Sequence, residues 1–348
     1  MDFFLQLVIN GIVVGSIYAL VAMGFVIIFK STSVLNFAQG EFLLVGAYIS
    51  LFLLVRYKIP FYATILITLL FAVVLGLLIE RLILRPMIGE PVISVIMVTL
   101  GLSSLLRSIV QGIWGTDTQP YPEIFPSQPV MLGPVPVSRA YLWSMACVLV
   151  LLVLFTLFFK YSRFGIAMRA TAFSQQVALS MGISVRFMFA LAWAIAAVVS
   201  AIGGILLGAM RTGVDQSLAL IGLKTIPVVI LGGLDSIPGA IIGGLLIGVL
   251  ENLAGGYLDP IFGGGVKEVA PFVILVAILM IKPYGLFGKV HIERVRGRQW
   301  RRSVAATSRP PTRRTWRSST PPLRAGRSPF SCSHCSPSRS SLPATGWT

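Results

Sequence analysis

Three polar residues that could bind a small polar molecule, Asn36, Gln39 and Glu41, interrupt an apolar run of the chain. Their amides and carboxylate offer hydrogen-bond donors and acceptors to a zwitterionic molecule. An ionised carboxylate at the centre of a bilayer costs about 2.5–3.5 kcal/mol on insertion scales, so Glu41 must be paired, hydrated or close to an interface. Two interpretations stay open. The cluster is either a helix-start or interface site, with Glu41 bonded to backbone or to a basic partner, or the polar lining of a path.

The sequence lacks the motifs that mark an enzyme or an ATP-hydrolysing pump. It contains no Gly-x4-Gly-Lys-Ser/Thr phosphate loop, no His-Glu-x-x-His and no Gly-x-Ser-x-Gly. The tetrapeptide Gly222-Leu223-Lys224-Thr225 resembles only the end of a phosphate loop and lies in an apolar segment. A self-powered carrier usually has several acids or histidines in its spans, and only Glu41 and Glu251 qualify. We therefore predict that the chain is not an enzyme and has no cofactor or metal site.

A second informative stretch is the polar segment 160–186. Its basic residues are Lys160, Arg163, Arg169 and Arg186. Strong helix formers with apolar residues at near-helical spacing predict one short helix over 167–181, and Gly182 is a good C-terminal stop. Such a helix could lie on a membrane surface or dock into a partner, and the physical pattern does not separate the two.

These groups are positioned by apolar stretches long enough to cross a bilayer. A bilayer core about 30 Å thick needs about 20 apolar residues of helix, and hydrophobic residues make up 56% of this chain against 11% charged ones. The predicted spans are 4–29, 35–55, 60–79, 92–113, 141–159, 187–210, 220–234, 238–257 and 267–283. Segments 35–55 and 220–234 are the weakest and could be re-entrant. We predict an all-α polytopic transmembrane bundle of eight or nine spans, since no segment has the alternation of a barrel strand.

The basic residues of the joins predict the orientation of the bundle. The joins 80–91 and 160–186 are basic, as is the stretch that follows the last span. The Pro-rich join 114–140 contains a single basic residue, Arg139, beside two acids. We expect the basic joins to be cytoplasmic and the Pro-rich join to be external, which places the N-terminus outside if there are nine spans.

Small residues four positions apart mark faces where membrane helices pack closely. Four pairs have this spacing: Gly11 with Gly15, Gly204 with Gly208, Gly239 with Gly243, and Gly244 with Gly248. Their density around 232–256 predicts a core of the bundle there, where a partner subunit could also pack.

The composition changes completely at Arg296. Residues 296–348 contain eleven Arg and eleven Ser but no Lys, Asp or Glu. We predict a transmembrane domain at 1–295 and a basic, Ser/Arg/Pro-rich, disordered tail at 296–348. The tail could be the product of read-through or a frameshift, a genuine tail that binds anionic lipid or nucleic acid, or a metal site at Cys332-Ser333-His334-Cys335. We favour the first, because selected polar tails usually mix charges, and so expect no nucleic-acid partner.

Segment 160–186 resembles the cytoplasmic coupling loop of permease subunits of bacterial ABC importers for branched-chain amino acids. The family's Ser-Arg-x-Gly-x-x-x-Arg-Ala start and Ala-x-x-x-Gly-Ile end are matched by Ser162-Arg163-Phe164-Gly165, Arg169-Ala170 and Ala178-Leu179-Ser180-Met181-Gly182-Ile183. The same family is resembled by Asn36-Phe37-Ala38-Gln39-Gly40-Glu41, Glu80-Arg81-Leu82-Ile83-Leu84-Arg85-Pro86, Leu231-Gly232-Gly233-Leu234-Asp235-Ser236-Ile237-Pro238-Gly239-Ala240 and Pro283-Tyr284-Gly285-Leu286-Phe287-Gly288. The resemblance covers 1–295. It departs at Gln39, where the family commonly has His, so a titrating role at that position is absent.

The resemblance implies a permease subunit of the bacterial inner membrane that receives its energy from other chains. Such permeases pair with a second, homologous permease subunit, two cytoplasmic ATPase subunits and an external solute-binding protein. This division of labour accounts for the missing phosphate loop. The implied coupling residues are Arg163, Gly165, Arg169, Ala170, Ala178, Met181 and Gly182.

The solute that the resemblance implies is a branched-chain or related amino acid, moved past the candidate path of Asn36, Gln39 and Glu41. The family also handles urea and short amides, so a urea or amide permease is the alternative. A self-powered secondary carrier centred on Glu41 is the alternative from a different class.

Overall fold

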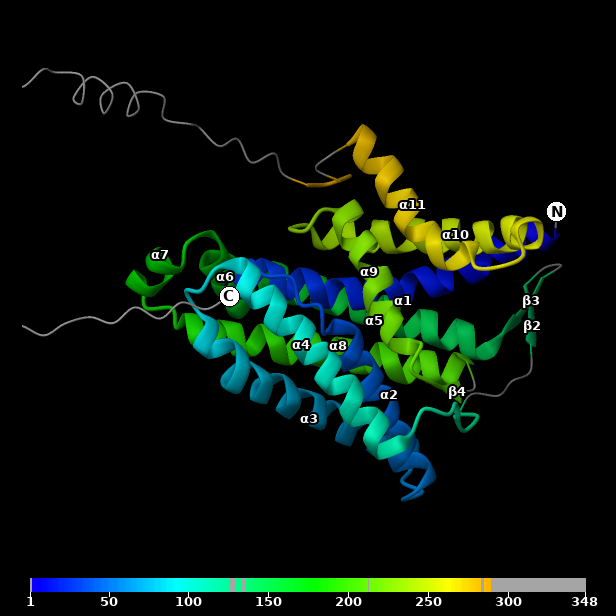
Figure 1. The fold of residues 1–348 in the computed structure, drawn as a ribbon, viewed down its shortest axis with the longest axis horizontal. Coiled ribbons are helices and arrows are strands. Elements are labelled where there is room, and N and C mark those ends of the chain that lie inside the picture. Colours follow the sequence, from blue (N-terminus) through cyan, green and yellow to red (C-terminus); the bar gives the residue numbers. More distant parts are fainter. Residues whose placement is uncertain (1, 125–128, 133–134, 212, 283–284, 289–348) are drawn as a thin grey trace, which may run out of the picture. The chain divides into compact units, whose positions relative to one another are not determined.

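The computed structural model describes residues 2–124, 129–132, 135–211, 213–282 and 285–288 (Figure 1). The chain divides into two units, Met1–His291 and Ile292–Thr348. The second unit, and with it the predicted tail at 296–348, lies outside the described residues. The long helices of the first unit are α1 (Asp2–Thr32), α2 (Gln39–Val55), α3 (Phe61–Ile79), α4 (Val92–Trp114), α5 (Arg139–Tyr161), α8 (Val185–Arg211), α9 (Leu218–Gly232), α10 (Ile237–Phe262) and α11 (Val266–Ile281).

The remaining elements are short and lie between these helices. They are the π-helix η1 (Glu80–Leu84), the 3₁₀-helix η2 (Arg85–Met87), the helices α6 (Arg163–Phe173) and α7 (Gln175–Ser180), and the strands β1 (Gln119–Pro120), β2 (Pro129–Leu132), β3 (Val135–Ser138) and β4 (Gly213–Val214). The strands form two antiparallel pairs, β1 with β4 and β2 with β3. The fold is thus mostly helical, as predicted, and these strand pairs are additions to the all-α prediction.

Six helices of the described part are long and apolar enough to cross a membrane, judged by length and composition. They are α1, α3 extended to Met87, α4, α5, α8 and α10. The other long helices are shorter, with 17 residues in α2, 15 in α9 and 16 in α11. The two weakest predicted spans, 35–55 and 220–234, correspond to α2 and α9.

The predicted span 35–55 begins later in the structure because its first residues form a turn. Ser33 ends α1 with a φ of 58°, in the left-handed region that commonly terminates helices. The Asn36 side chain then accepts a hydrogen bond from the Ala38 amide at 3.0 Å, which is an Asx turn. This local bond competes with helix formation, so α2 starts only at Gln39.

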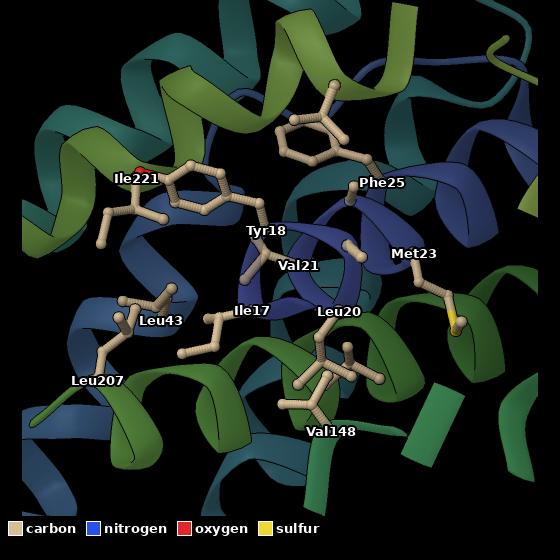
Figure 2. Packing of buried hydrophobic residues seen from close by; sticks show 14 of the residues in the cluster. Ile17, Tyr18, Leu20, Val21, Met23, Phe25, Leu43, Val148, Leu207 and Ile221 are labelled. Carbon is tan, nitrogen blue, oxygen red and sulfur yellow. The ribbon is translucent and has the colours of Figure 1, made fainter. Parts of the chain in front are cut away.

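Helix α1 lies at the centre of the bundle. In its most apolar stretch 83% of the residues are buried, against 22% in α4 and in α5. Figure 2 shows its side chains packed against residues of the surrounding helices. The labelled neighbours are Leu43 of α2, Val148 of α5, Leu207 of α8 and Ile221 of α9. A helix that is apolar all round is what a central position requires.

Helices α3, α4 and α5 are peripheral and expose long apolar side chains. Examples are Leu66 at 72%, Ile93 at 69% and Val150 at 64% exposure. In water such a surface would be a large apolar patch, whereas in a bilayer it faces acyl chains of the same polarity. The exposed apolar helices therefore fit a bundle that is surrounded by lipid.

Helices α1 and α10 cross with their backbones in close contact. A Cβ atom built on Gly11 would lie 2.6 Å from the Val249 Cα atom, and one on Gly15 would lie 2.7 Å from the Gly244 carbonyl oxygen. A Cβ on Gly248 would overlap the Gly15 backbone. These three glycines leave room only for hydrogen, which lets the two helices approach closely.

The other glycines that the sequence singled out have different neighbours. Gly204 lies against the backbone of Leu43 in α2, and Gly208 lies against the ring of Tyr121 in a join. Gly239 and Gly243 of α10 both lie against the backbone of α9. Gly208 is therefore placed beside a loop residue and not in a helix-to-helix crossing.

We expect Gly248→Leu to destabilise the bundle strongly. The new side chain would have to displace the α1 backbone, and overpacking typically costs about 1–3 kcal/mol. The variant should have a thermal midpoint clearly below the wild-type value. The measurement uses size-exclusion chromatography of the detergent-solubilised protein after heating. Gly112→Leu is the matched control, because a Cβ on this α4 glycine meets nothing within 4 Å. Equal midpoints for the two variants would contradict this role of Gly248.

Candidate functional site

The Glu41 carboxylate is held in a buried ion pair with α4. Its side chain is 2% exposed, and Arg107 donates to its Oε1 atom from Nη2 at 2.6 Å and from Nε at 3.1 Å. The Ser103 hydroxyl donates to the same oxygen at 3.0 Å. The other oxygen, Oε2, is buried and has no hydrogen-bond partner among the described residues. The site therefore has one saturated and one free carboxylate oxygen.

Asn36 and Gln39 are hydrogen-bonded to each other, and Gln39 is hydrogen-bonded to α8. Gln39 Nε2 donates to the Ser200 hydroxyl at 2.6 Å and to the Ala196 carbonyl at 3.3 Å. Asn36 Nδ2 donates to Gln39 Oε1 at 3.2 Å. Both side chains are fully buried. The structure thus divides the three predicted polar residues into an amide pair that is bonded to α8 and a carboxylate that is bonded to α4.

Sequence reasoning left Arg107 unmentioned, although it lies inside a predicted span. A usable signal was present, because Ser103, Arg107 and Gln111 follow one another at intervals of four and so share a face of α4. Gln111 is hydrogen-bonded to Gln216, which follows β4. The row of three polar residues on α4 therefore leads from the join after β4 to Glu41.

A second buried ion pair joins α9 and α10. Lys224 Nζ lies 2.8 Å from Glu251 Oε1, with side-chain exposures of 17% and 1%. The Tyr18 hydroxyl of α1 also interacts electrostatically with Glu251. The tetrapeptide that resembled the end of a phosphate loop thus has a packing and pairing role, since Gly222 also lies against the Gly40 backbone.

Segment 160–186 forms two short helices where the sequence predicted one. Ser174 adopts an extended conformation between α6 and α7, so the expected helix over 167–181 is interrupted. The Ser162 hydroxyl accepts from the Phe164 amide and the Ser174 hydroxyl from the Val177 amide, at 3.2 and 3.3 Å. Serine is a preferred N-cap, and each of these serines starts a helix. The predicted stop at Gly182 is present, with a φ of 80°.

The predicted coupling residues of this segment lie on two sides of it. Ala178 is buried against Val185 and Phe189, and Gly165 is buried against the Phe159 backbone. Ala170 is partly buried. The exposed members are Arg163, Arg169, Met181 and Gly182. Ala178 and Gly165 thus face inward in this conformation, and the role of all these residues in coupling stays a prediction.

Several large apolar side chains of the segment point away from the bundle. Phe173 is 94% exposed and Met181 is 77% exposed, and Val177 and Leu179 are also exposed. Figure 1 shows α6 and α7 at one end of the long helices, with β2, β3 and β4 at the other. Exposed apolar groups in an otherwise polar segment are typical of a binding surface.

A cavity of about 270 Å³ lies at the same end as α7. Its wall includes Thr32, Ser33, Glu80, Gln175, Phe189 and Trp193. Glu80, in the π-helix η1, is 2% exposed and pairs with Arg85 at 3.2 Å. Single-turn π-helices occur frequently at functional sites. The cavity can hold a small molecule beside the segment.

One ionisable group in a join has a shifted pKa. Burial raises the pKa of Tyr121 to about 12, and its hydrogen bond with the Ser50 hydroxyl at 3.0 Å opposes the shift. Tyr121 therefore stays protonated at neutral pH and adds no charge to the end of the bundle where β1 and β4 lie.

These features describe one class of protein. Several helices can span a membrane, charges are paired within the bundle, and segment 160–186 exposes large apolar side chains at one end. Among the described residues no group of three or more His, Cys, Asp or Glu could hold a metal ion. The arrangement is that of a multi-pass membrane protein.

The chain belongs to the family of permease components of branched-chain amino acid transport systems. The family model described as "Branched-chain amino acid transport system / permease component" matches residues 7–281. The high-affinity branched-chain amino acid transport system permease protein LivH of Salmonella typhimurium is 30% identical over 308 residues, covering 84% of this chain and 98% of that protein. BraD of Pseudomonas aeruginosa, of the same description, is 31% identical over 311 residues, with coverages of 84% and 98%.

A more distant relative comes from an archaeon. The probable branched-chain amino acid transport permease protein LivH of Methanocaldococcus jannaschii is 29% identical and covers 81% of this chain and 92% of that protein. Among solved structures, PsaBC from Streptococcus pneumoniae in complex with Fab matches with a TM-score of 0.44 and 14% identity, covering 82% of this chain and 94% of that one. The family is one of transport permeases, not of enzymes.

Proposed function

We propose that this chain is the transmembrane permease subunit of an ABC importer for branched-chain or related amino acids. The observation that carries the proposal is the family match over 7–281, which includes all the long helices except the first residues of α1. The solute arrives from an external binding protein and leaves into the cytoplasm. ATP is hydrolysed by partner subunits, in keeping with the missing phosphate loop.

The proposed assembly contains a second homologous permease subunit, two cytoplasmic ATPase subunits and the binding protein, in the bacterial inner membrane. Within it the chain has nine spans, counting the three short helices α2, α9 and α11 with the six long ones. The basic joins and α6–α7 are then cytoplasmic. The exposed apolar side chains of α6 and α7 contact the ATPase, together with Arg163, Arg169, Met181 and Gly182.

Glu41 is the candidate path residue with an available hydrogen-bonding atom, while Asn36 and Gln39 support it from the α8 side. A self-powered carrier centred on Glu41 has no specific observation in its favour, because that carboxylate is held by Arg107. The urea and amide alternative is decided by transport measurements.

The complex, purified with its ATPases and binding protein and placed in liposomes, should take up labelled leucine when ATP and the binding protein are both present. Uptake of urea but not of leucine would show that the solute is urea or a short amide and not an amino acid. Uptake of leucine by this chain without any ATPase would contradict the importer proposal.

Truncation after Val295 should leave membrane insertion and leucine uptake unchanged. The tail lacks acids and lysine, and the family match ends before it, at residue 281. Resequencing of the locus should find a lost stop codon or a shifted frame. Loss of uptake by the truncated chain at wild-type expression would make the tail functional.

A further inference from the structure

Arg107 is a charged residue placed well inside a peripheral helix. At 1.5 Å per residue, about 22 Å of α4 precede it and about 10 Å follow it, which places it at hydrocarbon depth and not at either membrane surface. Charged residues at such depth almost always face a bundle interior or a water-filled cavity. The Arg107 side chain is 36% exposed although it is paired with Glu41. Its bonds to Glu41 use Nε and Nη2, so the Nη1 group of this partly exposed side chain is not used in the ion pair.

Glu41 complements Arg107 with one buried carboxylate oxygen that is not hydrogen-bonded to the described residues. All three donors, two from Arg107 and one from Ser103, converge on Oε1 and leave Oε2 without a partner among the described residues. A buried acceptor without a partner loses the hydrogen bonds it had in water, so this arrangement costs free energy unless something binds there. A donor from outside the chain would remove the cost.

We propose that Arg107 and Glu41 form an exchangeable ion-pair gate for a zwitterionic solute, Arg107 taking the solute's carboxylate and Glu41 taking its ammonium through Oε2. This inference rests on the proposed function. A guanidinium binds a carboxylate with two parallel hydrogen bonds, and an ammonium group donates to a free carboxylate oxygen. One internal ion pair is then exchanged for two external ones, and no charge is left unpaired within the membrane. A molecule that carries neither a carboxylate nor an ammonium group, such as urea, cannot make this exchange.

The row on α4 supports the assignment. Gln111 and its partner Gln216 lie between the β4 end of the bundle and Arg107, so a solute entering from that end meets amide groups before the ion pair. The polar atoms of Gln39 and Asn36 have hydrogen-bond partners in α8, in each other and in the Ala38 amide, whereas Glu41 Oε2 has none among the described residues.

The test separates a gate from a purely structural ion pair. The double variant Glu41→Gln, Arg107→Gln removes both charges while keeping polar side chains, so no unpaired charge is left behind. The matched control is Lys224→Met, Glu251→Gln, because it also removes both charges of an ion pair between two helices of the bundle, in which the Glu side chain is 1% exposed. Both are reconstituted as the full complex, with leucine uptake and ATP hydrolysis stimulated by the binding protein measured on the same sample.

The gate predicts that the Glu41/Arg107 variant assembles and hydrolyses ATP but takes up leucine about tenfold to a hundredfold more slowly, as expected for lost charge-assisted hydrogen bonds. The leucine uptake of the control should stay within about twofold of the wild-type rate, because replacing a whole buried ion pair is often neutral. Wild-type uptake by the double variant overturns the gate, and so does an equal loss in the control.

If the double variant fails to assemble, Arg107→Lys decides the question. Lysine keeps the positive charge but cannot form the bidentate hydrogen bonds of arginine with a carboxylate. Leucine uptake should therefore fall about tenfold while assembly is retained. Wild-type uptake by this variant overturns the gate. Leucine uptake by the wild-type complex is the separate readout of the proposed function, so the gate can fail while the importer stands.

Discussion

Replacing Phe173 and Met181 together by glutamate should abolish co-purification of the ATPase subunits while the chain remains folded in the membrane. The two side chains are 94% and 77% exposed, so they contribute little to the internal packing of the bundle. Large apolar side chains at the centre of an interface typically contribute about 2 kcal/mol or more each, and unpaired charges in an apolar contact add a desolvation cost. Affinity purification of the complex, with the ATPase quantified per permease, measures the effect.

The control for this variant is Gln176→Glu. Gln176 is an exposed polar residue of α7, between the two substituted positions, so Gln176→Glu adds a charge to the segment without removing an apolar contact. Ala178→Glu should behave differently from both, because Ala178 is buried and a glutamate there would disrupt the packing of α7 on α8. Normal amounts of ATPase with the Phe173/Met181 variant would mean that the exposed side chains lie on the membrane surface.

The break between α6 and α7 shows where sequence reasoning was incomplete. An alanine-rich stretch with good helix formers predicts a continuous helix, because intrinsic propensity favours it. Ser174 overrides that preference by accepting from the Val177 amide, and the resulting turn exposes Phe173. The serine was visible in the sequence. The choice between an interior serine and a second N-cap depends on packing against α8, which a single sequence does not reveal.

The long helices were largely predictable, because they follow from uninterrupted apolar length. The residues at which these helices begin and end were less predictable. The predicted start of the second span at 35 moved to Gln39 through the Asx turn of Asn36, and the span predicted at 220–234 is shifted by two residues toward the N-terminus in α9 (Leu218–Gly232). The first difference arises because the hydrogen bond of the Asn36 side chain competes with the helix, and the second helix ends early because Gly233 has a φ of 97°, in the left-handed region.

The ion pairs show how much of the candidate site could be predicted from the sequence. The free-energy cost of burying the Glu41 carboxylate predicted that it is paired or hydrated, and a basic partner was one of the open interpretations. Arg107 is 66 positions away along the chain, so its identity depends on how α2 and α4 pack. The spacing of Ser103, Arg107 and Gln111 by four residues was the available clue. No comparable clue linked Lys224 with Glu251, which come from different helices.

Lys224→Met should destabilise the bundle more than any other single substitution considered for its charged residues. Glu251 is 1% exposed, and its Oε2 atom already lacks a hydrogen-bond partner among the described residues. Removing the lysine would leave a buried carboxylate with no countercharge in contact, and breaking a buried ion pair in this way costs about 3–5 kcal/mol. The thermal midpoint in detergent should drop sharply, and the yield of inserted protein should drop with it.

The double variant Lys224→Met, Glu251→Gln is the decisive control for that interpretation. It removes both charges, so the desolvation cost of the lone carboxylate disappears, and replacing a whole buried ion pair is often neutral or stabilising. Its midpoint should recover most of the loss, while Glu251→Gln alone should fall between the two, because Lys224 is 17% exposed and can reach water or a neighbouring carbonyl. If the double variant is as unstable as Lys224→Met, the lysine stabilises the bundle through packing of its aliphatic chain between α9 and α10, and its pairing with Glu251 contributes little.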